Sequence, residues 1–164
     1  MAMNNSTSRR TYPSPANAHR DPQLARLTYP ALADELSSFS DFLYFSIILE
    51  DIMPDVSALL EEIALDELEH YRMLSELIRS LGGNPAINTR LRTPLADISS
   101  DDDIAAINSL PDILRPLIAG EDQATAMYAE LVEYAGDNPA AAIFSRFSSD
   151  EADHARWLRQ IVVK

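Results

Sequence analysis

The chain contains no cysteine, which excludes disulfides, iron–sulfur clusters, rubredoxin-type iron sites and thiol catalysis. Glycine is rare as well, with only 4 residues in 164, while 46% of the residues are apolar. This composition favours one domain of packed helices with a sizeable core. Basic residues are outnumbered by acidic ones, 13 to 26, and the resulting net charge of −13 argues against nucleic acid as a partner.

Long apolar runs are also absent from the sequence. The best candidate, Phe42 to Leu49, is much shorter than the roughly 20 residues of a membrane span and is flanked by Asp41 and Glu50. The N-terminus lacks the apolar stretch of a secretory signal. We therefore expect a soluble protein in the cytoplasm that has no membrane partner.

The first 28 residues differ in composition from the rest of the chain. They hold four arginines against a single acid, Asp21, together with several prolines and many Asn and Ser residues. Such a composition predicts a disordered or loosely docked basic arm, followed by a helical domain over residues 29–164. A tether to an acidic partner and a tail without a role are both compatible with this pattern.

Four helical segments are predicted after the arm, over about residues 29–50, 55–81, 112–135 and 140–162. Ser100 and the acids after it look like an earlier start of the third segment, which Pro111 and Pro116 must break or kink. Short links join the first pair and the second pair, so each pair forms an antiparallel hairpin. About twenty residues separate the two hairpins, enough to cross a bundle from end to end.

One five-residue pattern, Asp-Glu-x-acid-His, occurs twice, at residues 66–70 and 150–154. Each copy contains Glu-x-x-His, which places Glu67 beside His70 and Glu151 beside His154 on one face of a helix. A single Glu-x-x-His is weak evidence, because most such pairs lie at the surface. Here both pairs fall within the apolar stripe of their helix, so we expect them to point into the bundle core.

The first and third segments each carry one glutamate in an otherwise apolar stripe, Glu35 and Glu121. They are 86 residues apart, and both members of the Glu-x-x-His pair recur after 84, so the two hairpins form a pseudo-repeat. Two divalent cations would balance four buried carboxylates, and neutral imidazoles would complete the coordination. The alternative pairs the motif glutamates with the histidines as buried salt bridges, but leaves two net negative charges in the core.

Three further residues are candidates for supporting roles. Asp66 and Asp150 lie four residues before the histidines, where each can accept the outer imidazole N–H of its own or the neighbouring helix. An ordinary exposed aspartate is the alternative. Tyr128 lies two turns after Glu121 and is a candidate to hydrogen-bond a bridging carboxylate, to relay an electron, or simply to fill the core.

Over about residues 29–162 the chain resembles the ferritin-like dimetal carboxylate superfamily, and most closely its rubrerythrin-like and manganese-catalase-like bacterial members, including the spore-coat group. The matching stretches are residues 35–36, 43–44, 47–50, 60–64, 81–85, 119–121, 128, 150–151 and 154. The resemblance implies an all-α, ferritin-like four-helix bundle with two iron or manganese ions. Glu67 and Glu151 would bridge the ions, Glu35 and His70 would complete one, and their counterparts in the second hairpin the other.

The resemblance also implies an oxidoreductase that acts on hydrogen peroxide or dioxygen, of the peroxidase, catalase or ferroxidase type. The chain lacks a rubredoxin-type module, so an external electron donor is expected, and so is a homo-oligomer. One alternative is an iron-handling ferroxidase or storage protein, although a storage cage would call for a fifth helix after the fourth. Another is a structural coat or cargo protein. Phe42 stands opposite Tyr128 in the pseudo-repeat, where related chains often carry Tyr.

Overall fold

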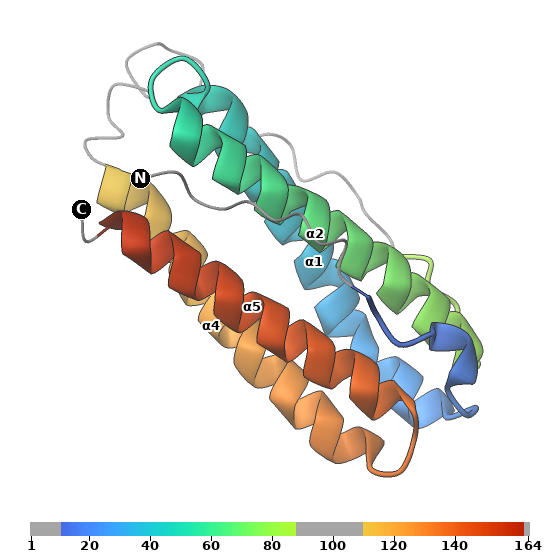
Figure 1. Cartoon of the computed structure of the whole chain (residues 1–164). Helices are drawn as coiled ribbons and strands as arrows, with labels where there is room; N and C mark the ends of the chain where they lie inside the picture. Colours follow the sequence, from blue (N-terminus) through green and yellow to red (C-terminus); the bar gives the residue numbers. More distant parts are fainter. Residues whose placement is uncertain (1–10, 88–109, 163–164) are drawn as a thin grey trace.

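The computed structural model describes residues 11–87 and 110–162 of the chain (Figure 1). Within these ranges the chain forms helices and no strand. The elements are a short 3₁₀ helix η1 (Pro15–Asn17) and the α-helices α1 (Pro22–Leu49), α2 (Pro54–Ser80), α4 (Leu110–Ala135) and α5 (Ala140–Val162). None of these helices is long and apolar enough to cross a membrane.

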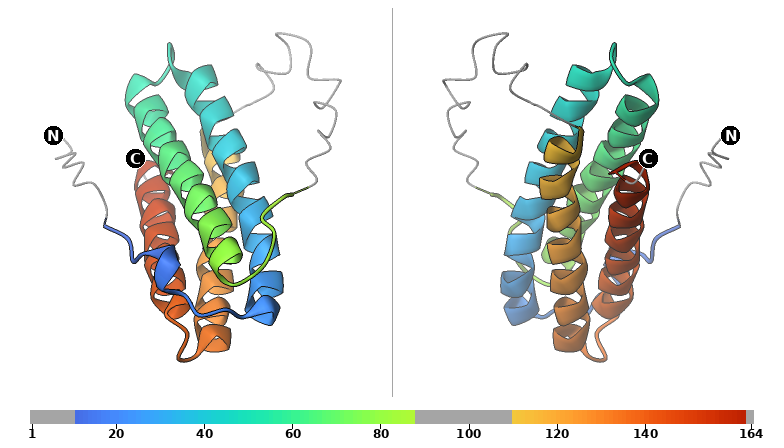
Figure 2. Two further views of the ribbon diagram at one scale, coloured as in Figure 1. Left: turned by 90° about the vertical axis from the view of Figure 1, so that its right-hand side faces the viewer. Right: turned by 90° about the vertical axis from the view of Figure 1, so that its left-hand side faces the viewer.

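The helices form two antiparallel hairpins, α1 with α2 and α4 with α5, packed side by side as a four-helix bundle (Figures 1 and 2). Gly136, with φ of 53°, lets the chain turn tightly between α4 and α5, because only glycine adopts this left-handed conformation freely. The end of α2 and the start of α4 lie at opposite ends of the bundle (Figure 1). The predicted ferritin-like bundle with an end-to-end connection is therefore confirmed.

The first long helix begins earlier than the sequence analysis predicted, at Pro22 instead of residue 29. The side chain of Asp21 caps it by accepting hydrogen bonds from the backbone N–H groups of Gln23 and Leu24, at 3.0 and 2.9 Å. Pro30 lies inside this helix, and Pro116 lies inside α4, without ending either. The predicted start of this helix is therefore wrong, whereas the domain boundary at residue 28 stays a prediction. The expected earlier start of the third segment at Ser100 lies outside the described residues.

Residues 11–21, which we call the N-terminal strap, dock against both hairpins. The backbone N–H of Asp21 donates to the carbonyl of Leu81 at the end of α2, at 3.0 Å. His19 and Asn138, in the turn between α4 and α5, exchange two hydrogen bonds of 3.2 and 2.9 Å. The strap then runs along α2 and α5 (Figure 1). These contacts show that residues 11–21 are docked, which is one of the two arrangements that the composition of the arm left open.

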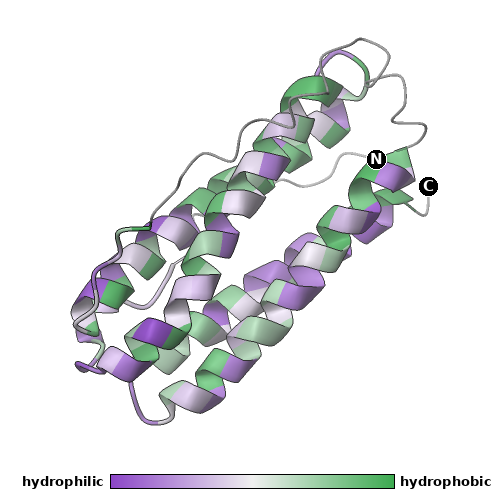
Figure 3. Cartoon of the chain, turned by 180° about the vertical axis from the view of Figure 1, so that it is seen from behind, coloured by the Kyte–Doolittle hydropathy of each residue, from purple (hydrophilic) through white to green (hydrophobic). Residues whose placement is uncertain are grey.

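The apolar core consists of two clusters, one toward each end of the bundle. One contains Leu74 and Phe144, and the other contains Phe42 and Leu60, all of which are nearly inaccessible to solvent. Figure 3 shows hydrophobic and hydrophilic residues alternating along the helices, as the amphipathic spacing requires. The polar residues of the centre described next lie buried on the same helices.

Candidate metal centre

The structure brings the six predicted ligands together in the middle of the bundle. They form two overlapping groups, Glu35–Glu67–His70–Glu151 and Glu67–Glu121–Glu151–His154. Within each group, one potential ligand atom from every residue lies within 4.8 Å of the others. None of the six side chains is more than 3% exposed. The two groups share the glutamates of the two Glu-x-x-His motifs.

Local helix geometry explains why these side chains point inward. On α2, the residues one and two turns from the motif, Leu60, Ile63, Leu74 and Leu77, are fully buried. Glu67 lies on the same stripe, so the packing that buries the leucines also carries the carboxylate into the core. The other three helices bury their own stripes in the same way, so each contributes its acid to the same level of the bundle.

The imidazole of His70 faces three carboxylates through Nδ1. Its distances are 2.9 Å to Oε1 of Glu151, 3.5 Å to Oε2 of Glu35 and 4.0 Å to Oε2 of Glu67. The shortest contact is therefore with the glutamate of the opposite motif helix, α5, and not with the glutamate three residues earlier. Residues from three helices thus surround one side of the centre.

The imidazole of His154 repeats this arrangement on the other side. Its Nδ1 lies 2.9 Å from Oε1 of Glu67, 3.2 Å from Oε2 of Glu121 and 3.3 Å from Oε2 of Glu151. The closest partner again belongs to the opposite motif helix, here α2. The pseudo-symmetry of the sequence therefore appears in the contacts themselves.

Several of these atoms have no hydrogen-bond partner, which is the observation that tests for a metal. Glu35 Oε2, Glu67 Oε1, Glu151 Oε1 and His70 Nδ1 are buried and make no hydrogen bond to any described residue. Unsatisfied buried polar atoms are rare in native proteins because each costs desolvation free energy. A cation between them would satisfy all four, and the carboxylate and imidazole set suits iron or manganese. The residues therefore fit a dimetal site.

The two aspartates contact the outer nitrogens of the histidines, and each does so across the bundle. Oδ2 of Asp66 on α2 lies 3.2 Å from Nε2 of His154, while Oδ2 of Asp150 on α5 lies 3.5 Å from Nε2 of His70. With Nδ1 directed into the centre, the Nε2–H group is the one left to donate to these carboxylates. Of the two arrangements that the sequence left open, the structure has the one between helices.

Tyr128 is fully buried, and its hydroxyl donates a hydrogen bond to Oε1 of Glu35. Its partner is therefore the glutamate of α1, which belongs to only one of the two ligand groups. It is not one of the glutamates that both groups share. Burial, followed by the negative charge of Glu35, raises the pKa of Tyr128 well above its usual value. Phe42, at the matching place in the first hairpin, is buried but has no hydroxyl, so it offers no such hydrogen bond.

Burial of so many acids perturbs their pKa values. Burial raises the pKa of Glu67 well above 4.5, and the charge of Glu151 raises it further. The pKa of Glu121 is also raised, chiefly by burial, although a hydrogen bond from His154 opposes this effect. Burial favours the neutral form of Glu151 too, but the hydrogen bond from His154 and the nearby imidazole of His70 outweigh it and lower the pKa of Glu151 below its usual range.

The pKa values of the two histidines are raised as well, which for an imidazole favours the charged form. Burial alone lowers the pKa of an imidazole, but the carboxylates around His70 and His154 outweigh this effect and raise both pKa values well above 6.5. The largest raising contribution comes from the charge of Glu35 for His70, and from the hydrogen bond with Asp66 for His154. Without metal, the centre therefore holds protons in the place of cations.

Two neighbours of the centre were missed by the sequence analysis, Tyr12 and Arg146. The hydroxyl of Tyr12, in the strap, lies 3.4 Å from Nε2 of His70, and the two rings meet edge to face at 5.9 Å. Arg146 binds Oδ1 of Asp150 at 2.8 Å. The spacing of four residues between Arg146 and Asp150 is a signal the sequence did contain. The sequence contained no such signal for Tyr12, because its composition placed this residue in the N-terminal arm, outside the predicted helical domain.

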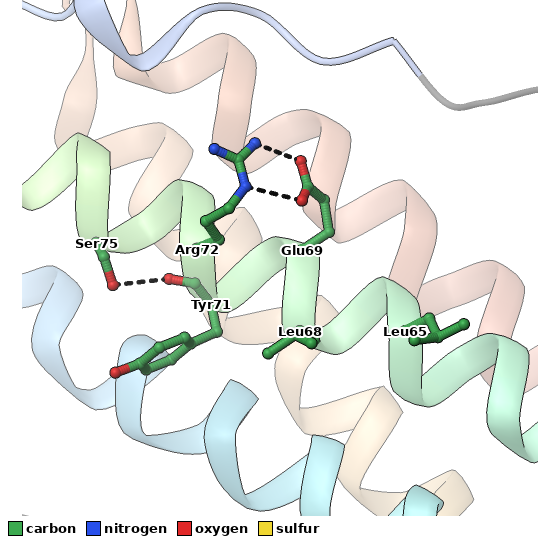
Figure 4. Close-up of a pocket in the computed structure, with 6 residues that line it drawn as sticks. All are labelled: Leu65, Leu68, Glu69, Tyr71, Arg72 and Ser75. Atoms are coloured by element: carbon green, nitrogen blue, oxygen red, sulfur yellow. Dashed lines mark hydrogen bonds and ion pairs between the residues drawn. The ribbon is translucent and has the colours of Figure 1, made fainter.

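A surface pocket on the outer face of α2 is distinct from this centre (Figure 4). It is lined by Leu65, Leu68, Glu69, Tyr71, Arg72 and Ser75. None of the six candidate ligands lines it, and Arg72 binds Glu69 across its edge. The chemistry predicted from the sequence therefore belongs to the buried centre and not to this pocket.

Comparisons with known proteins agree with the fold. A family model described as a ferritin-like domain matches residues 30–164. The bacterioferritin of Rhodobacter capsulatus, described with a metal-free dinuclear site and heme iron, is 23% identical, with 87% of this chain and 84% of that chain covered and a TM-score of 0.69. The dodecameric, bacterioferritin-related thioferritin of Bacteroides fragilis is 17% identical, with 88% and 87% covered and a TM-score of 0.70. No curated protein matches the sequence.

Proposed function

Because the chain belongs to the ferritin-like domain family, we propose that it is a dimetal carboxylate oxidoreductase acting on hydrogen peroxide or dioxygen. The observation that carries this proposal is the sharing of Glu67 and Glu151 by both groups of candidate ligands. Cations held by common carboxylates lie close enough together to act on one small molecule. When bound, two iron or manganese ions would supply the two-electron change that cleavage of an O–O bond requires.

Each of the six residues has a defined place in this proposal. The shared glutamates would contact both ions, and each remaining glutamate and histidine would contact one. The two sets of single-ion ligands are Glu35 with His70 and Glu121 with His154. The narrower kinship with rubrerythrin-like and manganese-catalase-like proteins is part of the proposal, as is the choice between iron and manganese.

The surrounding residues prepare the ligands. Asp66 and Asp150 face the outer nitrogens of the histidines, which would hold a proton there and leave Nδ1 as the nitrogen available to a cation. Tyr128 donates to Glu35 and keeps its own proton, because its pKa is raised. Buried side chains such as Phe147 exclude bulk water. This dry setting strengthens the electrostatic interactions of any charge that develops in the centre.

The solved structures favour a second candidate function, in which Fe(II) is itself the substrate. One similar protein is a bacterioferritin and the other is a dodecamer. By analogy, this chain would oxidise Fe(II) with dioxygen or peroxide and store the product within a homo-oligomer. The same centre would perform both candidate reactions, and they differ in the electron source. The first needs an external reductant unless the centre disproportionates peroxide. A cytoplasmic location belongs to both proposals.

Metal analysis paired with activity assays tests the proposal. We expect two ions per chain after loading with Fe(II) or Mn(II), and close to one after His70→Ala or His154→Ala. Asp122→Asn, which changes an aspartate that is 51% exposed and lies outside both ligand groups, is the matched control. The loaded protein should consume peroxide, with oxygen evolved if no reductant is needed.

The outcomes separate the candidates. Rapid Fe(II) oxidation followed by mineral loading would favour the iron-handling function over peroxide turnover. A fully loaded protein that neither consumes peroxide nor oxidises Fe(II) faster than free metal would overturn both. Only a structural role, as in a coat or cargo protein, would then be left for the metal.

A further inference from the structure

The N-terminal strap carries one aromatic side chain to the edge of the candidate metal centre. Its last residues are fixed to the bundle, through Asp21 at the end of α2 and through His19 at the turn between α4 and α5. The strap follows α2 and α5 (Figure 1), and Tyr12 near its start packs partly buried against the core, beside the ring of His70. A segment docked on both hairpins thus reaches a candidate ligand.

Tyr12 contacts the outer side of the His70 imidazole. Its hydroxyl oxygen lies 3.4 Å from Nε2, and the two rings meet edge to face with their centroids 5.9 Å apart. Phe147 packs against both rings, at centroid distances of 4.3 Å to His70 and 5.7 Å to Tyr12. The three rings form one packed cluster, so a rotation of the imidazole would have to displace its neighbours.

Arg146 on α5 links Tyr12 to the aspartate that faces the same imidazole nitrogen. Its guanidinium carbon lies 5.7 Å from the centroid of the Tyr12 ring, a cation–π distance, and its Nη2 lies 2.8 Å from Oδ1 of Asp150. Oδ2 of this aspartate lies 3.5 Å from Nε2 of His70. The two oxygens that face Nε2 therefore belong to side chains that contact one arginine.

The orientation of the His70 ring decides whether Nδ1 can act as a ligand. Nδ1 lies 2.9 Å from Oε1 of Glu151, and turning the ring over about its Cβ–Cγ bond would place a carbon there instead. The distances from Nε2 to the oxygens of Tyr12 and Asp150 both exceed the value of about 2.9 Å that is typical of an N–H···O hydrogen bond. One acceptor at such a distance constrains the ring weakly, whereas two acceptors and the packed rings constrain it together.

We propose that Tyr12 is a positioning residue, which holds the imidazole of His70 with Nδ1 directed into the candidate metal centre. This inference deepens the proposed function and rests on it, because His70 is a candidate ligand there. Tyr12 acts on the metal ion through His70, since the outer partners of a ligating histidine set the orientation of its ring. The N-terminal strap therefore belongs to the metal centre and is more than a tail docked on the bundle.

A titration of the full-length protein with Mn(II) tests the proposal. Tyr12→Phe is the main variant, because it keeps the ring and removes only the hydroxyl. We expect two ions per chain still to bind, with the affinity for one of them about tenfold weaker, as for the loss of an outer partner of a ligand. Tyr12→Ala also removes the ring and should weaken the same step further. Tyr134→Phe is the matched control, since this tyrosine is 67% exposed and lies outside both ligand groups.

A double-mutant cycle separates positioning of His70 from general support of the bundle. In the His70→Ala background, which should bind close to one ion, Tyr12→Phe should leave the affinity for that ion unchanged, because the residue through which it acts is gone. An equal loss in both backgrounds, or a wild-type isotherm for Tyr12→Phe, would overturn the inference while leaving the proposed function intact. A wild-type protein that binds fewer than two ions would overturn the proposed function, and this inference with it.

Discussion

Metal loading should release protons, because protons occupy the centre when metal is absent. Four of its groups, His70, His154, Glu67 and Glu121, have raised pKa values. Two divalent ions carry the same charge as four protons, so exchanging one set for the other leaves the core charge unchanged. We therefore expect loading of the metal-free protein to release up to about four protons per pair of ions near pH 6.

The same pKa shifts fix the sign of the pH dependence. Each proton displaced changes the free energy of binding by about 1.4 kcal/mol per pH unit, so the product of the two binding constants rises up to about 10⁴-fold per unit while all four are bound. The raised groups stabilise the metal-free fold below their unfolded pKa values, 6.5 for His70 and 4.5 for Glu67. That stability is lost as the pH rises through the folded values. Glu151, whose pKa is lowered, acts oppositely and stabilises the fold above 4.5.

Calorimetric titrations in two buffers with different protonation enthalpies give the number of protons released. Mn(II) is a suitable ion because it does not oxidise readily during the measurement. In parallel, the melting temperature of the metal-free protein should fall between about pH 6 and 8, while the gain in melting temperature on loading should grow. Release of fewer than about one proton near pH 6, or an affinity that falls as the pH rises, would refute the reasoning.

Three further predictions follow from single contacts. Tyr128→Phe removes the hydrogen-bond donor from buried Glu35 and should cost the metal-free protein about 1.5–3 kcal/mol in urea unfolding; an unchanged midpoint would contradict this contact. Asp66→Asn should weaken metal binding about 10- to 100-fold in a competition titration, whereas the exposed control Asp122→Asn should have no effect. Leu74→Ala, in the fully buried core, should cost about 2–5 kcal/mol, and a loss below about 1 kcal/mol would show that the core collapses around the cavity.

The sequence predicted the bundle because periodicity is a local property. Apolar residues at alternating spacings of three and four mark the buried face of a helix wherever it packs, and short links make neighbours antiparallel. Both hairpins and the end-to-end connection were predicted on that basis and are confirmed. The six candidate ligands could be singled out in the same way, since each interrupts an apolar stripe. Metal binding by them stays a prediction.

The start of the first helix was predicted too late for a physical reason as well. Composition averaged the first 28 residues into one basic, proline-rich arm, while the Asp21–Pro22 cap and the buried Leu24 mark a helix that starts within it. The docking of the strap could not be predicted, because it depends on surfaces that the folded bundle creates.

The sequence by itself thus determined which residues face the core and which chemistry they offer, since helical spacing sets the direction of a side chain within its own helix. The tertiary structure alone decided which helix each side chain meets. The contact of Asp66 with His154, the hydrogen bond from Tyr128 to Glu35 and the place of Tyr12 all join segments far apart in the chain. Such contacts depend on how helices rotate and cross when their side chains interlock, and residue spacing within one helix carries no record of it.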